Sequence, residues 1–189
     1  MTEDYTSVYT AQTGLHVDLQ MREESPREGA TRKQWFRLIT GTGRGAVVIA
    51  TRRDGGKEQI LLVRSFRPAA EQWFWELPRG WAEPEEVHEG INTYVEAALR
   101  ELFEETGKSA REPVLLGEYV TDTAVYPQCV GVVRCATTNA PDSPADGEVA
   151  AVRWTAVGDI HGLIRSGEIR DAHSLAAFAL WAAYGSESK

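Results

Sequence analysis

An acidic helical pattern at residues 94–106 constrains the fold of this chain more than any other feature. The segment is rich in good helix formers, and Gly107 behind it is a residue type that often follows a helix end. Thr93 followed by Glu96 fits a capping box, which predicts where the helix starts. Successive helical residues are about 100° apart, so the apolar positions share one face and three carboxylates share an adjoining face. These three glutamates are Glu101, Glu104 and Glu105.

Strand patterns lie on both sides of this helix. Before it, apolar runs on either side of an Asp-Gly-Gly turn predict a strand pair at 46–50 and 60–63. After it, three strands are predicted at 114–120, 130–136 and 149–155, and two helices at 160–165 and 172–184. The order is strands, helix, strands, helices. It predicts an α+β fold, a mixed sheet with helices packed on its faces.

An amino-terminal extension precedes this core. Residues 17–21 and 34–39 alternate wholly or partly between apolar and polar side chains, which suggests half-buried strands. A turn at 25–29 lies between them. We therefore expect an amino-terminal β-hairpin, and a division of the chain into an extension at 1–44 and a main domain at 45–189.

The charge balance limits the kinds of partner. The chain has 189 residues and a formal net charge of -8, with no run of Lys and Arg. Duplex DNA and anionic membranes both require a positive surface, so nucleic acid and membrane partners are disfavoured. The amino terminus is acidic where a signal peptide is basic, and the longest nearly apolar run, 175–184, is about half of a membrane span. We expect a cytoplasmic protein with a small-molecule partner.

The three clustered glutamates have two interpretations. On an isolated helix such carboxylates repel one another by a few tenths of a kcal/mol for each pair. Hard divalent cations such as Mg2+ and Mn2+ prefer clustered oxygen ligands and turn this repulsion into attraction. The alternative is an acidic helix face that is only solvated. The three glutamates alone leave both interpretations open.

The residues around the glutamates resemble the Nudix hydrolase signature, in which Gly, five residues, Glu and seven residues precede Arg-Glu-aliphatic-x-Glu-Glu-x-Gly-aliphatic. The five fixed positions of its core are Arg100, Glu101, Glu104, Glu105 and Gly107. At about 6% frequency for each residue, such a match arises by chance about once in a million windows. Upstream, Gly80 opens the signature and Glu86 follows at the required spacing.

The sequence departs from this signature at two places. Arg100 follows Glu86 by fourteen positions where the family has eight, so residues 87–94 include about six extra residues. This insertion lengthens the loop before the helix and alters the rim of the expected pocket. Lys108 stands at the last, aliphatic position, which is expected to weaken packing at the helix exit but removes no ligand.

The resemblance implies roles for particular residues. The three glutamates, with the backbone carbonyl of Arg79, would hold one or more Mg2+ or Mn2+ ions, and Arg100 would orient the glutamates through a salt bridge. Such ions neutralise a diphosphate and lower the pKa of an attacking water. The general base would be Glu105 or Glu148, the latter in a polar loop before the last strand. Arg67 and Arg79 would contact the substrate, although a strand-end arginine such as Arg67 can also be only solvated.

The similarity extends over roughly residues 34–184 and is greatest to enzymes like ADP-ribose pyrophosphatase. It implies a Nudix-like α/β/α sandwich, hydrolysis of ADP-ribose to AMP and ribose 5-phosphate, and a homodimer built through the amino-terminal hairpin. One alternative is hydrolysis of an NDP-sugar or another pathway-specific phosphate ester. Another is a non-catalytic Nudix-like nucleotide sensor, which the presence of all three glutamates disfavours.

Overall fold

The computed structural model describes residues 4–24, 33–88, 92–137, 147 and 149–186. Within these residues ten strands form two sheets. The strands are β1 (Thr6–Thr13), β2 (Leu15–Glu24), β3 (Lys33–Thr40), β4 (Arg44–Asp54), β5 (Lys57–Arg67), β6 (Gln72–Glu76), β7 (Arg79–Trp81), β8 (Ala110–Val120), β9 (Cys129–Thr137) and β10 (Val149–Ala156). The α-helices are α1 (Asn92–Thr106), α2 (Ile160–Arg165) and α3 (Ala172–Ser186), and short 3-10 turns lie at Pro68–Ala70, Pro84–Glu86 and Val157–Asp159.

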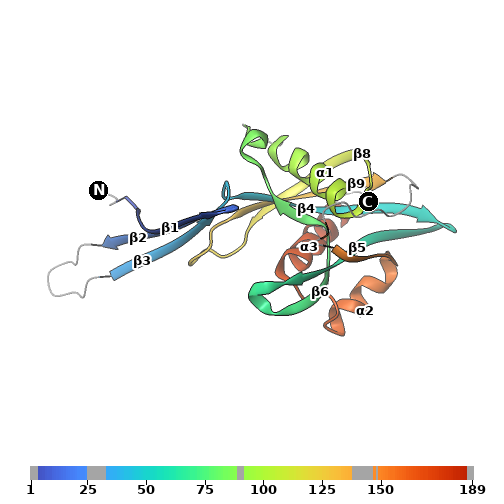
Figure 1. The fold of residues 1–189 in the computed structure, drawn as a ribbon. Helices are drawn as coiled ribbons and strands as arrows, with labels where there is room; N and C mark the ends of the chain where they lie inside the picture. The colour runs from blue at the N-terminus through green and yellow to red at the C-terminus, as the bar shows by residue number, and fades with distance from the viewer. Residues whose placement is uncertain (1–3, 25–32, 89–91, 138–146, 148, 187–189) are drawn as a thin grey trace.

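The larger sheet is mixed. Its order is β10-β5-β4-β9-β8, with β6 paired to β5 and β7 paired to β4. The β4–β9 pair is parallel and the others are antiparallel. Helix α1 covers one face, and α2 and α3 cover the other (Figure 1). This arrangement confirms the predicted α+β class and Nudix-like sandwich.

Strand β4 lies at the centre because its side chains enter both hydrophobic cores. Ala46, Val48 and Ala50 pack in the core on the α1 side, and Val47 and Ile49 pack in the core that contains α2 and α3. All five residues are at most 1% exposed. A strand that is buried on both faces has apolar residues at every position, which explains the continuous apolar run in the sequence.

In the large sheet β4 and β5 separate part of the way along their length. β4 and β5 pair over four residue pairs, and beyond these β5 pairs with β6 while β4 pairs with β7. Residues 76–79 cross from β6 to β7. Pro78 O accepts a hydrogen bond from Val48 N at 2.9 Å, and Ser174 Oγ of α3 accepts one from Leu77 N at 2.9 Å. The crossing segment is therefore fixed to β4 and to α3.

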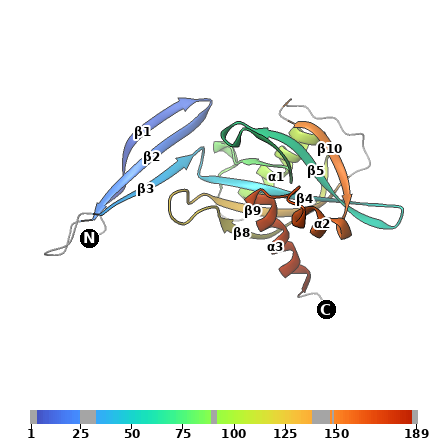
Figure 2. The same ribbon diagram turned by 90° about the horizontal axis from the view of Figure 1, so that it is seen from below.

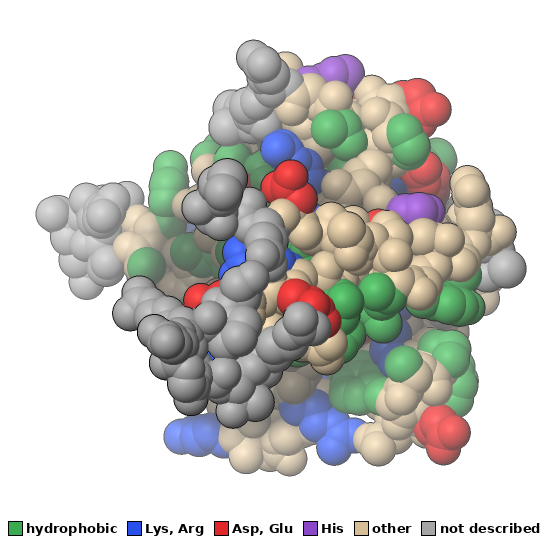
Figure 3. Space-filling view, turned by 90° about the vertical axis from the view of Figure 1, so that its left-hand side faces the viewer, with side chains coloured by type: hydrophobic (Ala, Val, Ile, Leu, Met, Phe, Trp, Pro, Cys, Tyr) green, Lys and Arg blue, Asp and Glu red, His purple; other side chains and the backbone are tan. Residues whose placement is uncertain are grey.

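The smaller sheet, of order β1-β2-β3, projects away from the main body (Figure 2). The β2–β3 pair confirms the predicted amino-terminal hairpin, whereas β1 was not predicted. The predicted turn at 25–29 lies outside the described residues. Hydrophobic side chains reach the surface at this end of the molecule (Figure 3). The exposed large apolar residues of this sheet are Val8, Tyr9, Leu15, Trp35 and Phe36.

The start of α1 differs from the prediction. The helix already includes Asn92, so Thr93 lies inside it, and Thr93 Oγ1 exchanges hydrogen bonds with the backbone N and O of His88 at 2.8 and 3.1 Å. Glu96 instead pairs with His88 Nε2 at 3.2 Å. The capping-box prediction was therefore wrong, because the loop before the helix offered Thr93 a backbone partner. At the other end, the Lys108 side chain is buried, at 2% exposure.

No helix in the described part of the chain is long and apolar enough to span a membrane.

Candidate active site

A buried carboxylate between two arginines marks the split in the sheet. Glu76, at the end of β6, is 0% exposed. It accepts a hydrogen bond from Arg67 Nε at 2.7 Å, with a second, shorter contact from Arg67 Nη2, and one from Arg79 Nη2 at 3.3 Å. The side chains of Arg67 and Arg79 are 29% and 22% exposed, so both guanidinium groups also reach the surface. Two cations share one anion here, which leaves the group with a net positive charge.

The α1 glutamates approach the same segment from the other side of β7. Glu105 is 4% exposed, and its Oε2 accepts a hydrogen bond from Arg79 N at 3.2 Å. The Glu101 carboxylate lies against Gly80, where a Cβ atom would collide with it. Gly45 on β4 is equally constrained, because a Cβ there would lie 2.7 Å from Gly80 O. Glycine at 80 therefore lets α1 bring its carboxylates against β7.

Arg100 lies among the glutamates of α1 and the preceding loop. Its Nη1 is 2.9 Å from Glu101 Oε1 and 2.7 Å from Glu104 Oε2, and its Nε donates to Glu86 Oε1 at 2.9 Å. Its Nη2 donates to the backbone O of Trp81 at 2.6 Å. One guanidinium thus links the helix, the loop and β7. This is the geometry expected of a residue that orients the glutamates, although that role stays a prediction.

The buried glutamates hold their protons more tightly than usual. Burial, together with the nearby charges of Glu101 and Glu76, raises the pKa of Glu105 to about 9. Burial also raises the pKa of Glu101 to about 7, although Arg100 opposes this. A nearby positive charge favours the ionised form of a carboxylate. The site is therefore one where a bound cation would replace protons.

The oxygen-rich donor set fits a hard divalent cation. Glu101 and Glu105 both lie at β7, burial is the main cause of their raised pKa values, and their carboxylate oxygens are the ligands that such a cation prefers. Glu104 is turned toward Arg100, and its side chain is 43% exposed. No three His, Cys, Asp or Glu side chains form a ready-made metal cluster among the residues that the structure describes. Of the predicted ligands, the structure brings Glu101, Glu105 and Arg79 together and leaves Glu104 at the rim.

Glu148, the second predicted candidate for the general base, lies outside the described residues. Residues 89–91 of the predicted insertion also lie outside them.

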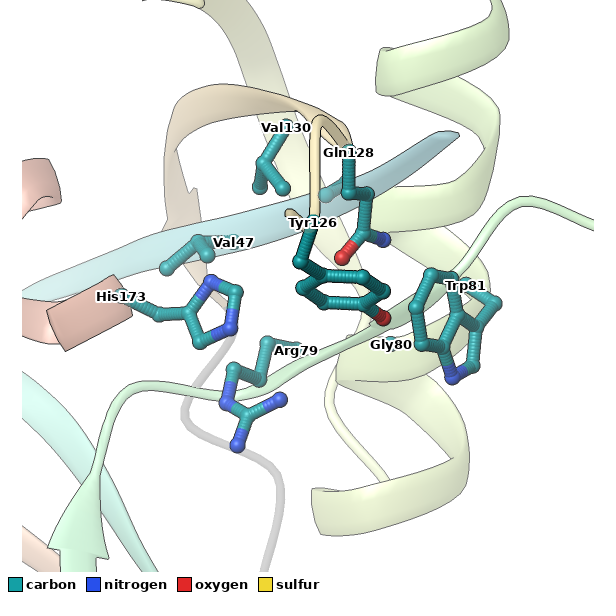
Figure 4. Close-up of a pocket in the computed structure, with 9 residues that line it drawn as sticks. Val47, Arg79, Gly80, Trp81, Tyr126, Gln128, Val130 and His173 are labelled. Carbon is teal, nitrogen blue, oxygen red and sulfur yellow. The ribbon is translucent and has the colours of Figure 1, made fainter. Parts of the chain in front are cut away.

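A small cavity lies on the α3 side of β7 (Figure 4). Its volume is about 110 Å3, and its walls include Val47, Val130, Arg79, Tyr126, Gln128 and His173. Tyr119 OH lies 2.6 Å from His173 Nδ1, which fixes the imidazole. Burial and the charges of Arg79 and Arg67 lower the pKa of His173 to about 3, so the ring is neutral at pH 7.

Sequence reasoning missed Glu76, His173 and Gln128. A charged residue in the otherwise aromatic and apolar run Trp-Phe-Trp-Glu-Leu-Pro was a usable indication for Glu76, because such a residue is rarely buried without a partner. Nothing in the sequence marks His173 or Gln128, which depend on how α3 and the loop before β9 pack against β7.

Comparisons with known proteins show which family and fold this chain shares. The chain is 42% identical over 69 residues to ADP-ribose pyrophosphatase of Saccharomyces cerevisiae, a match that covers 36% of this chain and 27% of the yeast enzyme. This stretch is only about a quarter of the yeast enzyme's length. The crystal structure of an ADP compounds hydrolase shares the fold, with a TM-score of 0.65 and 18% identity over 97% of this chain and 95% of that chain. The family model for the NUDIX domain matches residues 41–178, which is well over half of the sequence. With the signature residues of α1 facing β7 within that match, the chain belongs to the NUDIX domain family.

Proposed function

We propose that this protein is a Mg2+-dependent pyrophosphohydrolase that cleaves a nucleoside diphosphate linked to another moiety, with ADP-ribose as substrate and AMP and ribose 5-phosphate as products. One observation carries the proposal. The Arg67–Glu76–Arg79 group and the carboxylates of Glu101 and Glu105 meet at the segment that crosses the split sheet. Cationic donors for phosphate thus lie beside anionic ligands for a metal ion.

The chain's own residues divide the work between binding and proton transfer. Arg67 and Arg79 bind the diphosphate through charge-assisted hydrogen bonds, for which a planar guanidinium is well suited. Glu101, Glu105 and the Arg79 carbonyl would hold Mg2+ or Mn2+, with Glu104 at the rim. When bound, the ion neutralises phosphate charge and lowers the pKa of water. Arg100 holds Glu101 in place. Glu105 accepts the proton of the attacking water, and Glu148 is the alternative base.

The choice of ADP-ribose is supported by the similarity to the yeast ADP-ribose pyrophosphatase. An NDP-sugar offers the same diphosphate to the arginine pair, so it is the rival substrate class. A non-catalytic sensor would not need a buried carboxylate such as Glu105 in contact with the phosphate-binding segment.

A substrate screen tests the proposal. With Mg2+ or Mn2+ the protein is incubated with ADP-ribose, NDP-sugars and dinucleoside diphosphates, and release of nucleoside monophosphate is measured. We expect turnover of ADP-ribose that EDTA abolishes and excess Mg2+ restores. Hydrolysis that persists after EDTA and extensive dialysis would contradict metal dependence. Binding of these compounds without any turnover would favour the sensor.

We also propose that the protein is a homodimer formed through the sheet β1-β2-β3. Both Trp35 and Phe36, neighbours on β3 that point to opposite faces, are exposed, so each face of this thin sheet carries apolar surface. A three-stranded sheet with both faces in water is poorly stabilised, and exposed apolar patches usually mark interfaces. Light scattering should give twice the chain mass of 20.9 kDa, and Phe36→Lys should shift it toward the monomer. A monomeric wild-type protein at micromolar concentration would contradict the proposal.

A further inference from the structure

We infer that Arg170 selects substrates that carry an anionic group, such as a carboxylate, on the moiety linked to the second phosphate. The inference rests on the proposed hydrolysis of a nucleoside diphosphate derivative and narrows the class of its substrate. Arg170 lies between α2 and α3, and its side chain is exposed. It belongs neither to the arginine pair at Glu76 nor to the carboxylates of α1, so it adds a third group to the site.

Arg170 lies on the face of β6 that carries the buried carboxylate. Side chains alternate along a strand, so Gln72, Phe74 and Glu76 share one face of β6. The Arg170 guanidinium donates a hydrogen bond to Gln72 Oε1, and its central carbon lies 5.2 Å from the centre of the Phe74 ring. Gln72 is paired with Arg67 across the β5–β6 ladder. The loop after α2 therefore brings a third arginine beside the pair that shares Glu76.

Arg170 differs from the other two arginines because it has no carboxylate partner. Arg67 and Arg79 share the Glu76 carboxylate. No ion pair within the described part of the chain includes Arg170, whose hydrogen bond goes to a neutral amide. A guanidinium has five N–H donors, so most of them are left for an anion. The amide and the ring also hold the side chain in place, which lowers the entropy cost of binding that anion.

The spacing along β6 separates Arg170 from the diphosphate. At about 3.3 Å per residue, the Cα atom of Glu76 lies about 7 Å from that of Phe74 and about 13 Å from that of Gln72. These last two residues are the ones that Arg170 contacts. The two phosphates of a diphosphate share a bridging oxygen, so a diphosphate at the arginine pair occupies only the Glu76 end of this face. Adenosine itself is uncharged at pH 7, so an anion at Arg170 is carried by the moiety on the second phosphate.

The kinetic test compares ADP-glucose with ADP-glucuronic acid, which differ only in a CH2OH group against a carboxylate and which both give AMP. In the wild type we expect kcat/KM to be about fivefold higher for ADP-glucuronic acid, as for a charge pair that is partly in water. Arg170→Met keeps the aliphatic stem beside Phe74 and removes the charge, so the ratio should fall to about one. Arg170→Lys should retain part of the preference, because it keeps the charge without the planar donors.

Arg53→Met is the matched control. Arg53 is an exposed arginine beside the turn between β4 and β5, and its loss changes the net charge by the same amount. This variant should keep the wild-type ratio, because a charge that far from the site is screened by salt. A wild-type ratio near one would overturn the inference. So would equal losses on both substrates in Arg170→Met, which would indicate a structural role, or an equal change of the ratio in Arg53→Met.

A binding measurement separates this inference from the proposed function. Glucose 1-phosphate and glucuronic acid 1-phosphate are titrated into the protein in EDTA and followed by NMR. Wild type should bind the acid about fivefold more tightly, and Arg170→Met should lose this difference. If neither ADP derivative is hydrolysed but this difference is present, the proposed function fails and the inference stands. If both are hydrolysed with equal kcat/KM, the inference fails and the proposed function stands. If nothing is hydrolysed and the two sugar phosphates bind equally or not at all, both fail.

Discussion

Glu105→Gln is expected to lower kcat for metal-dependent hydrolysis by about a thousandfold, within the range known for loss of a general base. The substitution keeps the shape of a side chain that is 4% exposed and keeps an oxygen for the hydrogen bond from Arg79 N. It removes the negative charge that would hold a cation and the group that would accept the proton of water. The measurement is single-turnover hydrolysis of ADP-ribose at saturating Mg2+.

The same variant should be more stable than the wild type when no metal is present. The folded pKa of Glu105 is raised to about 9, while an unfolded glutamate titrates near 4.5. Between these values the unfolded chain loses a proton that the folded chain retains, so wild-type stability falls as pH rises from about 4.5 to about 9. Glutamine has no such titration. At pH 8 in EDTA, Glu105→Gln should therefore melt at a higher temperature than the wild type.

Glu96→Gln is the matched control for both measurements, because Glu96 is on the same helix with a half-exposed side chain that pairs with His88. It should change neither turnover nor melting temperature by much. Glu105→Gln with full activity would remove Glu105 from the mechanism and leave Glu148 as the base. If Glu105→Gln and the wild type had the same melting temperature at every pH from 5 to 9, Glu105 would be ionised in the metal-free protein.

The sequence predicted the main elements because their patterns are local. The helix of the three glutamates, the buried strand at β4 and the two carboxyl-terminal helices all lie within a few residues of their predicted positions. Edge strand β1 was missed because its side chains are mostly exposed, so it lacks the alternation that identifies a half-buried strand. The sequence also did not predict that β4 and β5 separate and pair with β7 and β6, because this split depends on tertiary packing.

The α1 part of the candidate site was predictable from spacing within one helix, whereas Arg67 and Arg79 were predicted only from the family resemblance. Glu101, Glu105 and Arg100 follow from spacing along α1, and the structure brings all three to β7. Glu76 and His173 could not be placed in the same way. Glu76 meets Arg67 across a pair of antiparallel strands, and His173 meets Arg79 only because α3 packs under the crossing segment. Contacts between segments far apart in the sequence leave no periodic pattern to recognise.

Glu76→Gln is expected to cause the largest loss of stability of any single substitution at this site. Removing one partner of a buried ion pair costs about 3–5 kcal/mol, and because both arginines partly reach water we expect about 2–3 kcal/mol here. For a chain of this size that lowers the melting temperature by about 4–12 °C. Glutamine keeps the volume of Glu76 but points an NH2 group toward the guanidinium donors of Arg67 or Arg79. It also removes the negative charge that the two arginines share, so the two guanidinium groups repel one another.

The kinetic effect of Glu76→Gln should be distinct from this loss of stability. Arg67 and Arg79 keep their charges, but their positions are no longer fixed, so KM for a diphosphate substrate should rise more than kcat falls. Glu58→Gln is the matched control, because Glu58 pairs with Arg134 at 3.3 Å at the surface, where an ion pair is worth less than about 1 kcal/mol. Glu76→Asp should recover part of both effects, since it restores the charge one methylene short. Equal melting temperatures for Glu76→Gln and Glu58→Gln would show that the buried carboxylate does not hold the two arginines. Arg67 and Arg79 would then have to bind phosphate independently of each other.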